Sequence, residues 1–509
     1  MRSLRAWVVL CLLSSTIGAA TVAEEKVLQD NWYVVHLAGQ RVGYLRSRVV
    51  QAGGAAAPIV TTETMRMTVA REQARVPVEM TLEQHEDAAG RLRSFAIATR
   101  ASTMAILATG TVREQELELA TYSAGSTTRR TLPWDPEVIG SWAQHRLIAA
   151  NLAPGRQVEF KTFVPDLVTI SKATVKVGNL EEVPLLRGIE RLRRVTTTVE
   201  AMPQLTLTAW LDGQGRVVKS HIPLMGGVET HLATREEALR EVEEFPDLVS
   251  QFVVRPNVVL PAPERVVEVL YRLSAPGERL KHQPPPDRRQ TIVRREGDAV
   301  WVRVEVAPPP ARPPAFDPSE RQPGGAVENV AEEYRLPGPY IQSDDAEIVA
   351  VARQATAGAR DQWEAAKRLE SWVRDNIRVK DLSVGFASAR ETLQTRAGDC
   401  TEHAVTLAAL CRAVGLPARV AVGLACWRGV FAYHMWTEVY VGEWAALDAA
   451  LPGPFVSAAR IKLSDSSLRT GSWGQSLVDL LPLIGQMKIE ILAYRLHGEE
   501  RVVVAPPAP

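Results

Sequence analysis

Residues 398–404 read Gly398-Asp399-Cys400-Thr401-Glu402-His403-Ala404. From Cys400 onward, apolar residues recur at helical spacing as far as Val414, and Gly415 then ends the pattern as a left-handed cap. The pattern predicts a helix whose first turn begins at Cys400. The N-terminus of a helix carries partial positive charge and free N–H groups, and both favour a thiolate over a thiol. Cys400 is therefore a candidate nucleophile.

Three strands are predicted after this helix, at Ala418–Leu424, Tyr433–Val441 and Trp444–Asp448. Side chains alternate between the two faces of a strand, so His434 and Trp436 share one face of the second strand. A cysteine at a helix start, a histidine on one strand and an aspartate on the next can converge in space. A thiol triad needs these three groups: a nucleophile, an imidazole that moves the proton, and a carboxylate that fixes the tautomer of the imidazole.

Three sequence blocks, followed by a terminal Asp448, resemble the core of the transglutaminase-like superfamily. The blocks occur in order at plausible spacings, and they are residues 398–404, Gly415-Leu416-Pro417-Ala418-Arg419-Val420 and His434-Met435-Trp436-Thr437-Glu438-Val439.

The resemblance implies an α+β, papain-like core in residues 341–460, with Cys400, His434 and Asp448 as the catalytic residues. It also implies reactions that range from amide hydrolysis to transamidation, without a cofactor. One departure is mild: Ala449 and Ala450 stand where the family often has proline and then threonine or serine.

Other residues are also expected around the predicted triad. His403 shares a helix face with Cys400, which suggests a metal site as an alternative, but zinc normally takes three or four protein ligands. Cys411 is three turns away and cannot supply one, so no metal is expected and His403 is expected to line the site. The backbone N–H of Cys400 is one oxyanion donor, and Gln394 is a candidate for the second. Trp436 is expected to pack over the site.

Two classes of function follow from these residues. The first is an enzyme in which Cys400 attacks an amide or peptide carbonyl and the thioester is resolved by water, or by a lysine amine in a crosslinking enzyme. Hydrolysis is preferred because no calcium loops are visible in an exported chain. The second class is a non-catalytic scaffold that retains the core. An intact triad favours the enzyme, with a protein or peptide as its substrate.

The charge balance and the N-terminal residues indicate which partners and which cellular location to expect. The chain has 59 basic and 59 acidic residues, so no net field attracts nucleic acid. Residues 1–23 have the basic, apolar and small-residue segments of a signal peptide, which predicts a secreted or periplasmic protein without stable membrane insertion after cleavage. An uncleaved anchor is the alternative. Oligomeric state is not predicted.

The rest of the chain divides by pattern into further units. Residues 24–250 are mostly period two, which predicts a large antiparallel β-rich domain, with one helix at about 136–152 and a capping box at Thr234 and Glu237. Residues 251–340 read as a small β segment with proline-rich spacers. Residues 461–509 are predicted to extend the core and to end in a disordered tail at 505–509.

Overall fold

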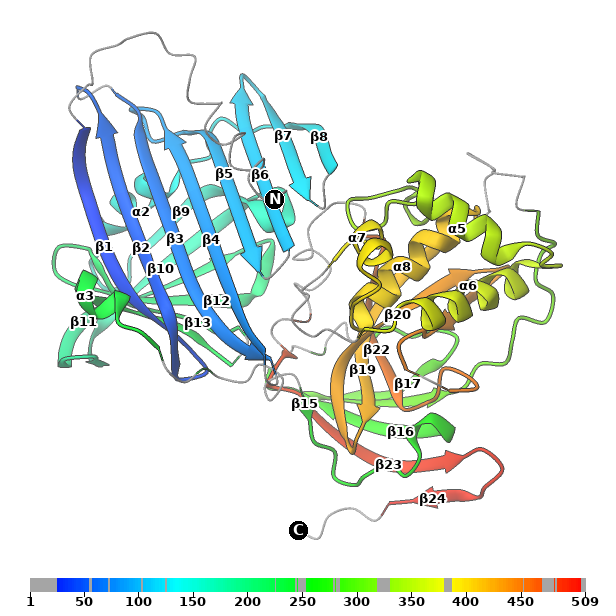
Figure 1. Cartoon of the computed structure of the whole chain (residues 1–509). Coiled ribbons are helices and arrows are strands. Elements are labelled where there is room, and N and C mark those ends of the chain that lie inside the picture. Colours follow the sequence, from blue (N-terminus) through cyan, green and yellow to red (C-terminus); the bar gives the residue numbers. More distant parts are fainter. Residues whose placement is uncertain are drawn as a thin grey trace.

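The computed structural model describes residues 25–504 apart from 55–56, 72–73, 102–103, 124–125, 225, 243–244, 246–252, 278–279, 281–283, 318–329, 380–386, 452, 469–479 and 481–482. The predicted signal peptide (1–23) and disordered tail (505–509) lie outside the described residues. Figure 1 shows the N-terminal strands on one side, and helices α5 to α8 with the C-terminal strands on the other.

The N-terminal region is a single antiparallel sheet over its described residues. Consecutive strands pair from β1 to β8 and from β9 to β14, and β1 pairs with β14, so the strand order is β8-β7-β6-β5-β4-β3-β2-β1-β14-β13-β12-β11-β10-β9 with β8 and β9 at its edges. The strands are β1 (Glu25–Leu37), β2 (Gln40–Ala52), β3 (Ile59–Arg71), β4 (Ala74–Glu86), β5 (Leu92–Ala101), β6 (Met104–Arg113), β7 (Glu116–Ser123), β8 (Ser126–Pro133), β9 (Gln157–Val164), β10 (Thr169–Leu185), β11 (Gly188–Val199), β12 (Met202–Leu211), β13 (Val217–Ile222) and β14 (Val228–Ala233).

The helix predicted at 136–152 is shorter than expected. Helix α2 spans only Ser141–Ala149, because the backbone of the residues before it forms hydrogen bonds with the sheet instead of a helical turn. The N–H of Ile139 donates to the carbonyl of Lys161, and the N–H of Leu92 donates to the carbonyl of Val138. The predicted capping box is present at Thr234, where helix α3 (Arg235–Leu239) begins.

Two smaller sheets follow in the C-terminal half. In the first, the order is β15-β20-β19-β22 with β21 paired to β20; in the second, it is β17-β18-β16-β23-β24. The second sheet therefore combines strands from before and after the helices. The strands are β15 (Val253–Val254), β16 (Val266–Ser274), β17 (Gln290–Glu296), β18 (Ala299–Glu305), β19 (Ala418–Trp427), β20 (Val430–Tyr440), β21 (Trp444–Leu447), β22 (Arg460–Ser466), β23 (Lys488–Leu496) and β24 (Arg501–Val503).

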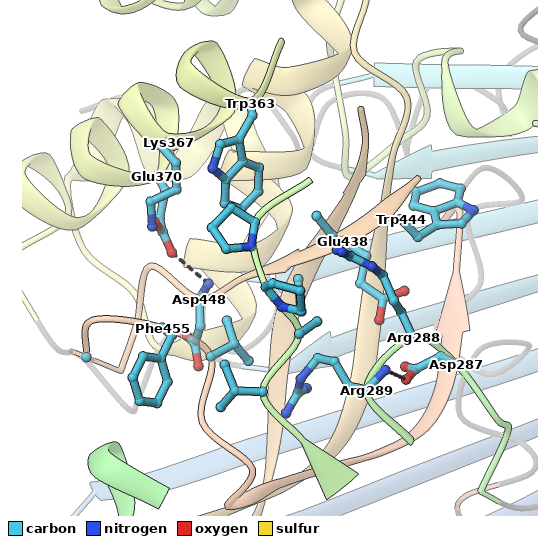
Figure 2. Close-up of a pocket in the computed structure, with 18 of the residues that line it drawn as sticks. Asp287, Arg288, Arg289, Trp363, Lys367, Glu370, Glu438, Trp444, Asp448 and Phe455 are labelled. Atoms are coloured by element: carbon cyan, nitrogen blue, oxygen red, sulfur yellow. Dashed lines mark hydrogen bonds and ion pairs between the residues drawn. The ribbon is translucent and has the colours of Figure 1, made fainter. Parts of the chain in front are cut away.

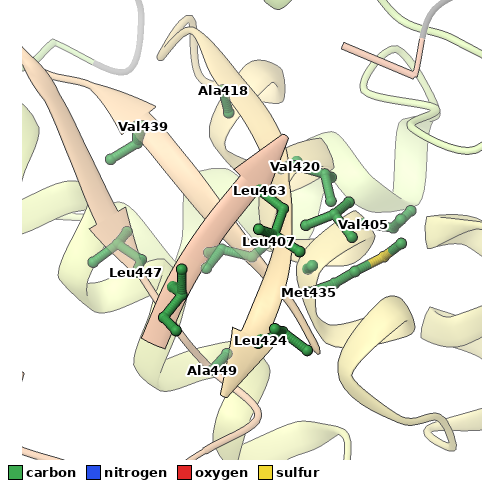
Figure 3. Close-up of a cluster of buried hydrophobic side chains, with 14 of the residues drawn as sticks. Val405, Leu407, Ala418, Val420, Leu424, Met435, Val439, Leu447, Ala449 and Leu463 are labelled. Atoms are coloured by element: carbon green, nitrogen blue, oxygen red, sulfur yellow. The ribbon is translucent and has the colours of Figure 1, made fainter. Parts of the chain in front are cut away.

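Four helices pack with these sheets around one hydrophobic core. They are α5 (Ala346–Thr356), α6 (Gln362–Asn376), α7 (Ala389–Thr395) and α8 (Cys400–Ala413). Short 3-10 turns occur at Pro165–Leu167, Pro263–Arg265 and Glu332–Tyr334. Figure 3 shows Val405 and Leu407 of α8 beside Val420 and Met435 of the adjoining strands, and all four are buried in the same cluster. Helix α8 is thus held against β19 and β20 by apolar side chains.

The predicted α+β class is confirmed, with a large antiparallel N-terminal region followed by helices and then strands. The individual domain limits remain a prediction. In the part of the chain that the structure describes, no helix combines the length and the apolar character needed to span a membrane.

Candidate active site

Cys400 is the first residue of α8, as the sequence predicted. Asp399 is the N-cap: its Oδ1 accepts a hydrogen bond from the N–H of Thr401 at 2.9 Å. In return, Oε2 of Glu402 accepts from the N–H of Asp399 at 2.8 Å, which completes a capping box. The Cys400 side chain is half-buried and packs against the main core, while every residue from Thr401 to Ala413 is buried. The helix start is therefore fixed firmly around the thiol.

Glu402 ties the start of α8 to the preceding helix. Its Oε1 accepts a hydrogen bond from the N–H of Ala387, just before α7, at 2.8 Å. Gly398 permits this packing, because a Cβ at that position would lie 2.3 Å from the Cβ of Glu402. Burial raises the pKa of Glu402 to about 8, and the adjacent Asp399 carboxylate adds to the rise. Through its hydrogen bonds, Glu402 joins the start of α8 to the segment before α7.

The structure brings His434 and Asp448 together. Nε2 of His434 on β20 lies 2.9 Å from Oδ2 of Asp448, the residue that follows β21. Both residues are buried, with 7% and 5% of their surface exposed. Because Asp448 occupies Nε2, Nδ1 is the imidazole nitrogen left to exchange a proton with a nucleophile. The Trp436 ring stacks on the His434 ring at a centroid distance of 6.1 Å.

Asp448 accepts hydrogen bonds from several elements. Oδ1 accepts from the N–H groups of Ala450 and Leu451, each at 3.1 Å, and Oδ2 accepts from Nε of Arg460 at 2.7 Å. Burial alone would raise the pKa of Asp448, but the charges of His434 and Arg460 and their hydrogen bonds outweigh it and hold that pKa well below its usual range. The carboxylate is therefore ionised throughout the neutral range.

The backbone of Asp448 is anchored from a distant helix. Its N–H donates to Oε1 of Glu370 on α6 at 2.9 Å, a contact drawn in Figure 2. Glu370 is buried, with 4% of its surface exposed, and Lys367 pairs with its other oxygen. Helix α6 thus fixes the position of the loop that carries the predicted triad carboxylate.

The first turn of α8 packs against the strand that carries His434. Oγ1 of Thr437 on β20 donates to the carbonyl of Ala404 at 2.9 Å. His403, on the same turn, lies close enough to Asp448 for the carboxylate to act on its pKa, although burial dominates and lowers it. Nδ1 of His403 lies 2.6 Å from the carbonyl of Asp399. Helix α8 therefore packs against β20, the strand that carries His434.

Gln394, two other cysteines and Glu438 differ in burial and in hydrogen bonding. Gln394 is exposed on α7, and its role as an oxyanion donor stays a prediction. Cys411 and Cys426 are buried free thiols, and burial raises the pKa of each. Glu438 is structural in its contacts, because its Oε2 accepts from Nζ of Lys462 and from Nε of Arg419, both at 2.7 Å.

A cavity of about 430 Å³ opens beside Asp448. Figure 2 shows aromatic side chains around it, among them Trp363, Trp444 and Phe455. Asp448 lines this cavity, whereas neither Cys400 nor His434 is among the described lining residues. The cavity thus lies on the carboxylate side of the pair.

Sequence reasoning missed Arg460 and Glu370. Both are buried and bond to Asp448, yet Arg460 comes 12 residues after it and Glu370 comes 78 residues before it. An arginine at the start of a strand and a glutamate within an amphipathic helix have no local signal that separates them from ordinary surface residues. Only the tertiary structure reveals their contacts.

Comparisons with known proteins agree with the resemblance. Residues 349–449 match the model of the transglutaminase-like superfamily. A comparison with curated proteins gives no match. Among solved structures, the chain is similar to a proposed cysteine protease from Cytophaga hutchinsonii, with 16% identity, a TM-score of 0.29, and coverage of 50% of this chain and 86% of that one. It is also similar to a β-barrel-like protein of a domain family of unknown function from Brucella abortus, with 14% identity, a TM-score of 0.31, and coverage of 42% and 98%. At these scores neither structure supports an argument.

Proposed function

We propose that the transglutaminase-like domain at residues 349–449 makes this chain an exported cysteine-dependent enzyme that hydrolyses amide or peptide bonds. Cys400 is the nucleophile, His434 moves the proton and Asp448 orients His434. The observation that carries the proposal is the buried contact of 2.9 Å between His434 and Asp448, with His434 on the strand against which the helix that begins at Cys400 packs.

The chemistry follows the order of a thiol hydrolase. The Cys400 thiolate attacks the carbonyl carbon, and the charge that develops on oxygen is stabilised by the N–H of Cys400 at the helix start. The imidazolium of His434 then protonates the departing amine, and the C–N bond breaks to leave a thioester on Cys400. Water, deprotonated by neutral His434, attacks this thioester and releases the acid and the thiol. Asp448 stays ionised and holds Nε2 of His434 in each step.

In the wild-type protein, we expect iodoacetamide to alkylate Cys400 about as fast near pH 6 as near pH 8, because an imidazolium partner and the helix start keep the thiol ionised. Peptide mass spectrometry measures the rate, with fragmentation to separate Cys400 from Cys411, since both lie on the tryptic peptide 397–412. Buried Cys411 and Cys426 should stay unlabelled and so report an intact fold. Slow labelling of Cys400 that rises only above about pH 8, as for an ordinary thiol, would contradict the proposal.

We expect water to resolve the thioester without help from an amine. p-Nitrophenyl acetate acylates a nucleophilic thiol whatever its natural substrate, so the acetyl group on Cys400 can be followed by mass spectrometry. Its loss should proceed at the same rate with and without Nα-acetyllysine amide. Acceleration by this amine, with acetyl transfer to its side chain, would instead assign a crosslinking transglutaminase. Cys400→Ser is the control for acylation elsewhere.

A further inference from the structure

One oxygen of Asp448 contacts two basic side chains. Oδ2 lies 2.9 Å from Nε2 of His434 and 2.7 Å from Nε of Arg460. All three residues are buried, and Arg460 has 4% of its surface exposed. The mechanism above uses His434 and Asp448 but assigns nothing to Arg460. A buried arginine on the carboxylate of a predicted triad therefore needs a role of its own.

The sheet brings Arg460 to this position by its register. On β19, Gly423 pairs with His434 of β20 on one side, and Ala425 pairs with Arg460 of β22 on the other. Gly423 and Ala425 are two residues apart, so they share a face of the strand. Because both are small, long side chains from the two neighbouring strands can meet above β19. A Cβ at position 423 would lie 2.8 Å from the Trp436 ring, so the packing on this face of β19 requires glycine there.

Further contacts hold the guanidinium in place. Nη1 of Arg460 donates to Oγ of Ser457 at 2.8 Å. The carbonyl of Arg460 accepts from Nη2 of buried Arg289 at 3.3 Å, and the same Nη2 donates to the carbonyl of Ser457 at 2.8 Å. Both the side chain and the backbone of Arg460 are therefore hydrogen-bonded, which holds its charge beside Asp448.

We infer that Arg460 is a positioning residue that partly neutralises Asp448 and so sets the pH range over which Cys400 and His434 form a thiolate–imidazolium pair. This inference rests on the proposed function. A carboxylate that is shared with a guanidinium attracts an imidazolium less than an unshared one does, and the guanidinium also favours the deprotonated form of every acid nearby. Loss of the Arg460 charge should therefore move the ionisation of both Cys400 and His434 to higher pH.

Other ionisable groups surround the pair, but they remain in place when Arg460 alone is changed. They come from each packed element and are Cys400, Asp399 and His403 at the start of α8, Glu370 and Lys367 on α6, Glu438 on β20, Lys462 on β22, and Asp287 and Arg289 before β17. Arg460 differs from these groups because it bonds to Oδ2 of Asp448, the oxygen that also contacts His434.

The test compares pH profiles of Cys400 alkylation by iodoacetamide in the wild type, Arg460→Gln, Arg460→Lys and Ser457→Ala. Arg460→Gln removes the charge but keeps an N–H donor, and its profile should shift by about one pH unit to higher pH. Arg460→Lys keeps the charge, and Ser457→Ala removes only a supporting hydrogen bond, so both should retain the wild-type profile. A purely structural residue would change the amplitude of labelling without moving its pH dependence.

A second measurement follows His434 directly. In a Cys400→Ser background with 13C-labelled histidine, the NMR signal that His434→Ala removes should titrate at higher pH in Arg460→Gln. An unshifted profile in folded Arg460→Gln, while His434→Ala still slows alkylation near pH 6, would overturn the inference and leave the proposed function intact. If His434→Ala leaves the alkylation rate of Cys400 near pH 6 unchanged, the proposed function itself is wrong. If Arg460→Gln and Arg460→Met both expose Cys411 while Arg460→Lys stays folded, the charge is needed only for folding and the inference is wrong.

Discussion

Replacing His434 with alanine should slow the alkylation of Cys400 by iodoacetamide near pH 6 by about 10- to 100-fold. An ordinary thiol with a pKa of about 8.5 is only about 0.3% thiolate at pH 6, whereas a thiol paired with imidazolium is mostly ionised. The gain in ionised fraction is partly offset, because a thiolate of lower pKa is a weaker nucleophile. The alkylation rates of Cys400 in the wild type and in His434→Ala should therefore become more similar as the pH rises toward 9.

The control for this variant is His85→Ala. His85 is on β4 of the N-terminal sheet and pairs with Glu83, so its loss removes a histidine without touching the candidate site. Cys411 should remain unlabelled in both variants, which shows that α8 is intact. Equal rates for His434→Ala and the wild type across the pH range would mean that His434 does not ionise Cys400, and the triad would have to be abandoned.

The parts of the site that could be predicted from sequence depend on local patterns. The start of α8 at Cys400 follows from the apolar spacing, and Gly415 has the positive φ of 83° expected of a helix cap. The face shared by His434 and Trp436 follows from strand alternation, and their rings stack. Such signals lie within a few residues of one another, so they can be recognised without knowing the fold.

The parts that could not be predicted depend on pairing between distant segments. Strand β23 pairs with β16, although more than 200 residues separate them, and no turn in the sequence marks that pairing. Arg460 and Glu370 reach Asp448 only because β22 lies beside β19 and α6 packs on α8. A charged residue is exposed in most sequence contexts, so its burial is decided by tertiary partners that the local pattern does not contain.

Arg412→Met should lower the free energy of opening of α8 by about 3 kcal/mol. Arg412 is buried on α8, and its guanidinium donates to the carbonyls of Ala418, Ser467 and Leu336 at 2.7–3.0 Å. Methionine fills a similar volume but leaves these buried acceptors without their donor. Each unsatisfied acceptor costs about 1–3 kcal/mol, and water that reaches the acceptor reduces this cost. Burial lowers the pKa of Arg412 to about 10, so the side chain is still charged near neutral pH and the cost of burying that charge offsets part of the loss.

Cys411 supplies the readout, because it adjoins Arg412 and is fully buried. In a Cys400→Ser background, its alkylation as a function of urea concentration reports the opening of α8 alone, which avoids treating the whole chain as one two-state unit. Arg353→Met is the matched control: Arg353 is exposed on α5, and its loss should change the free energy of opening by less than about 0.5 kcal/mol. If the two variants opened equally easily, the three carbonyls would be satisfied without Arg412. The junction of α8, β19 and the segment after β22 would then be held by apolar packing alone.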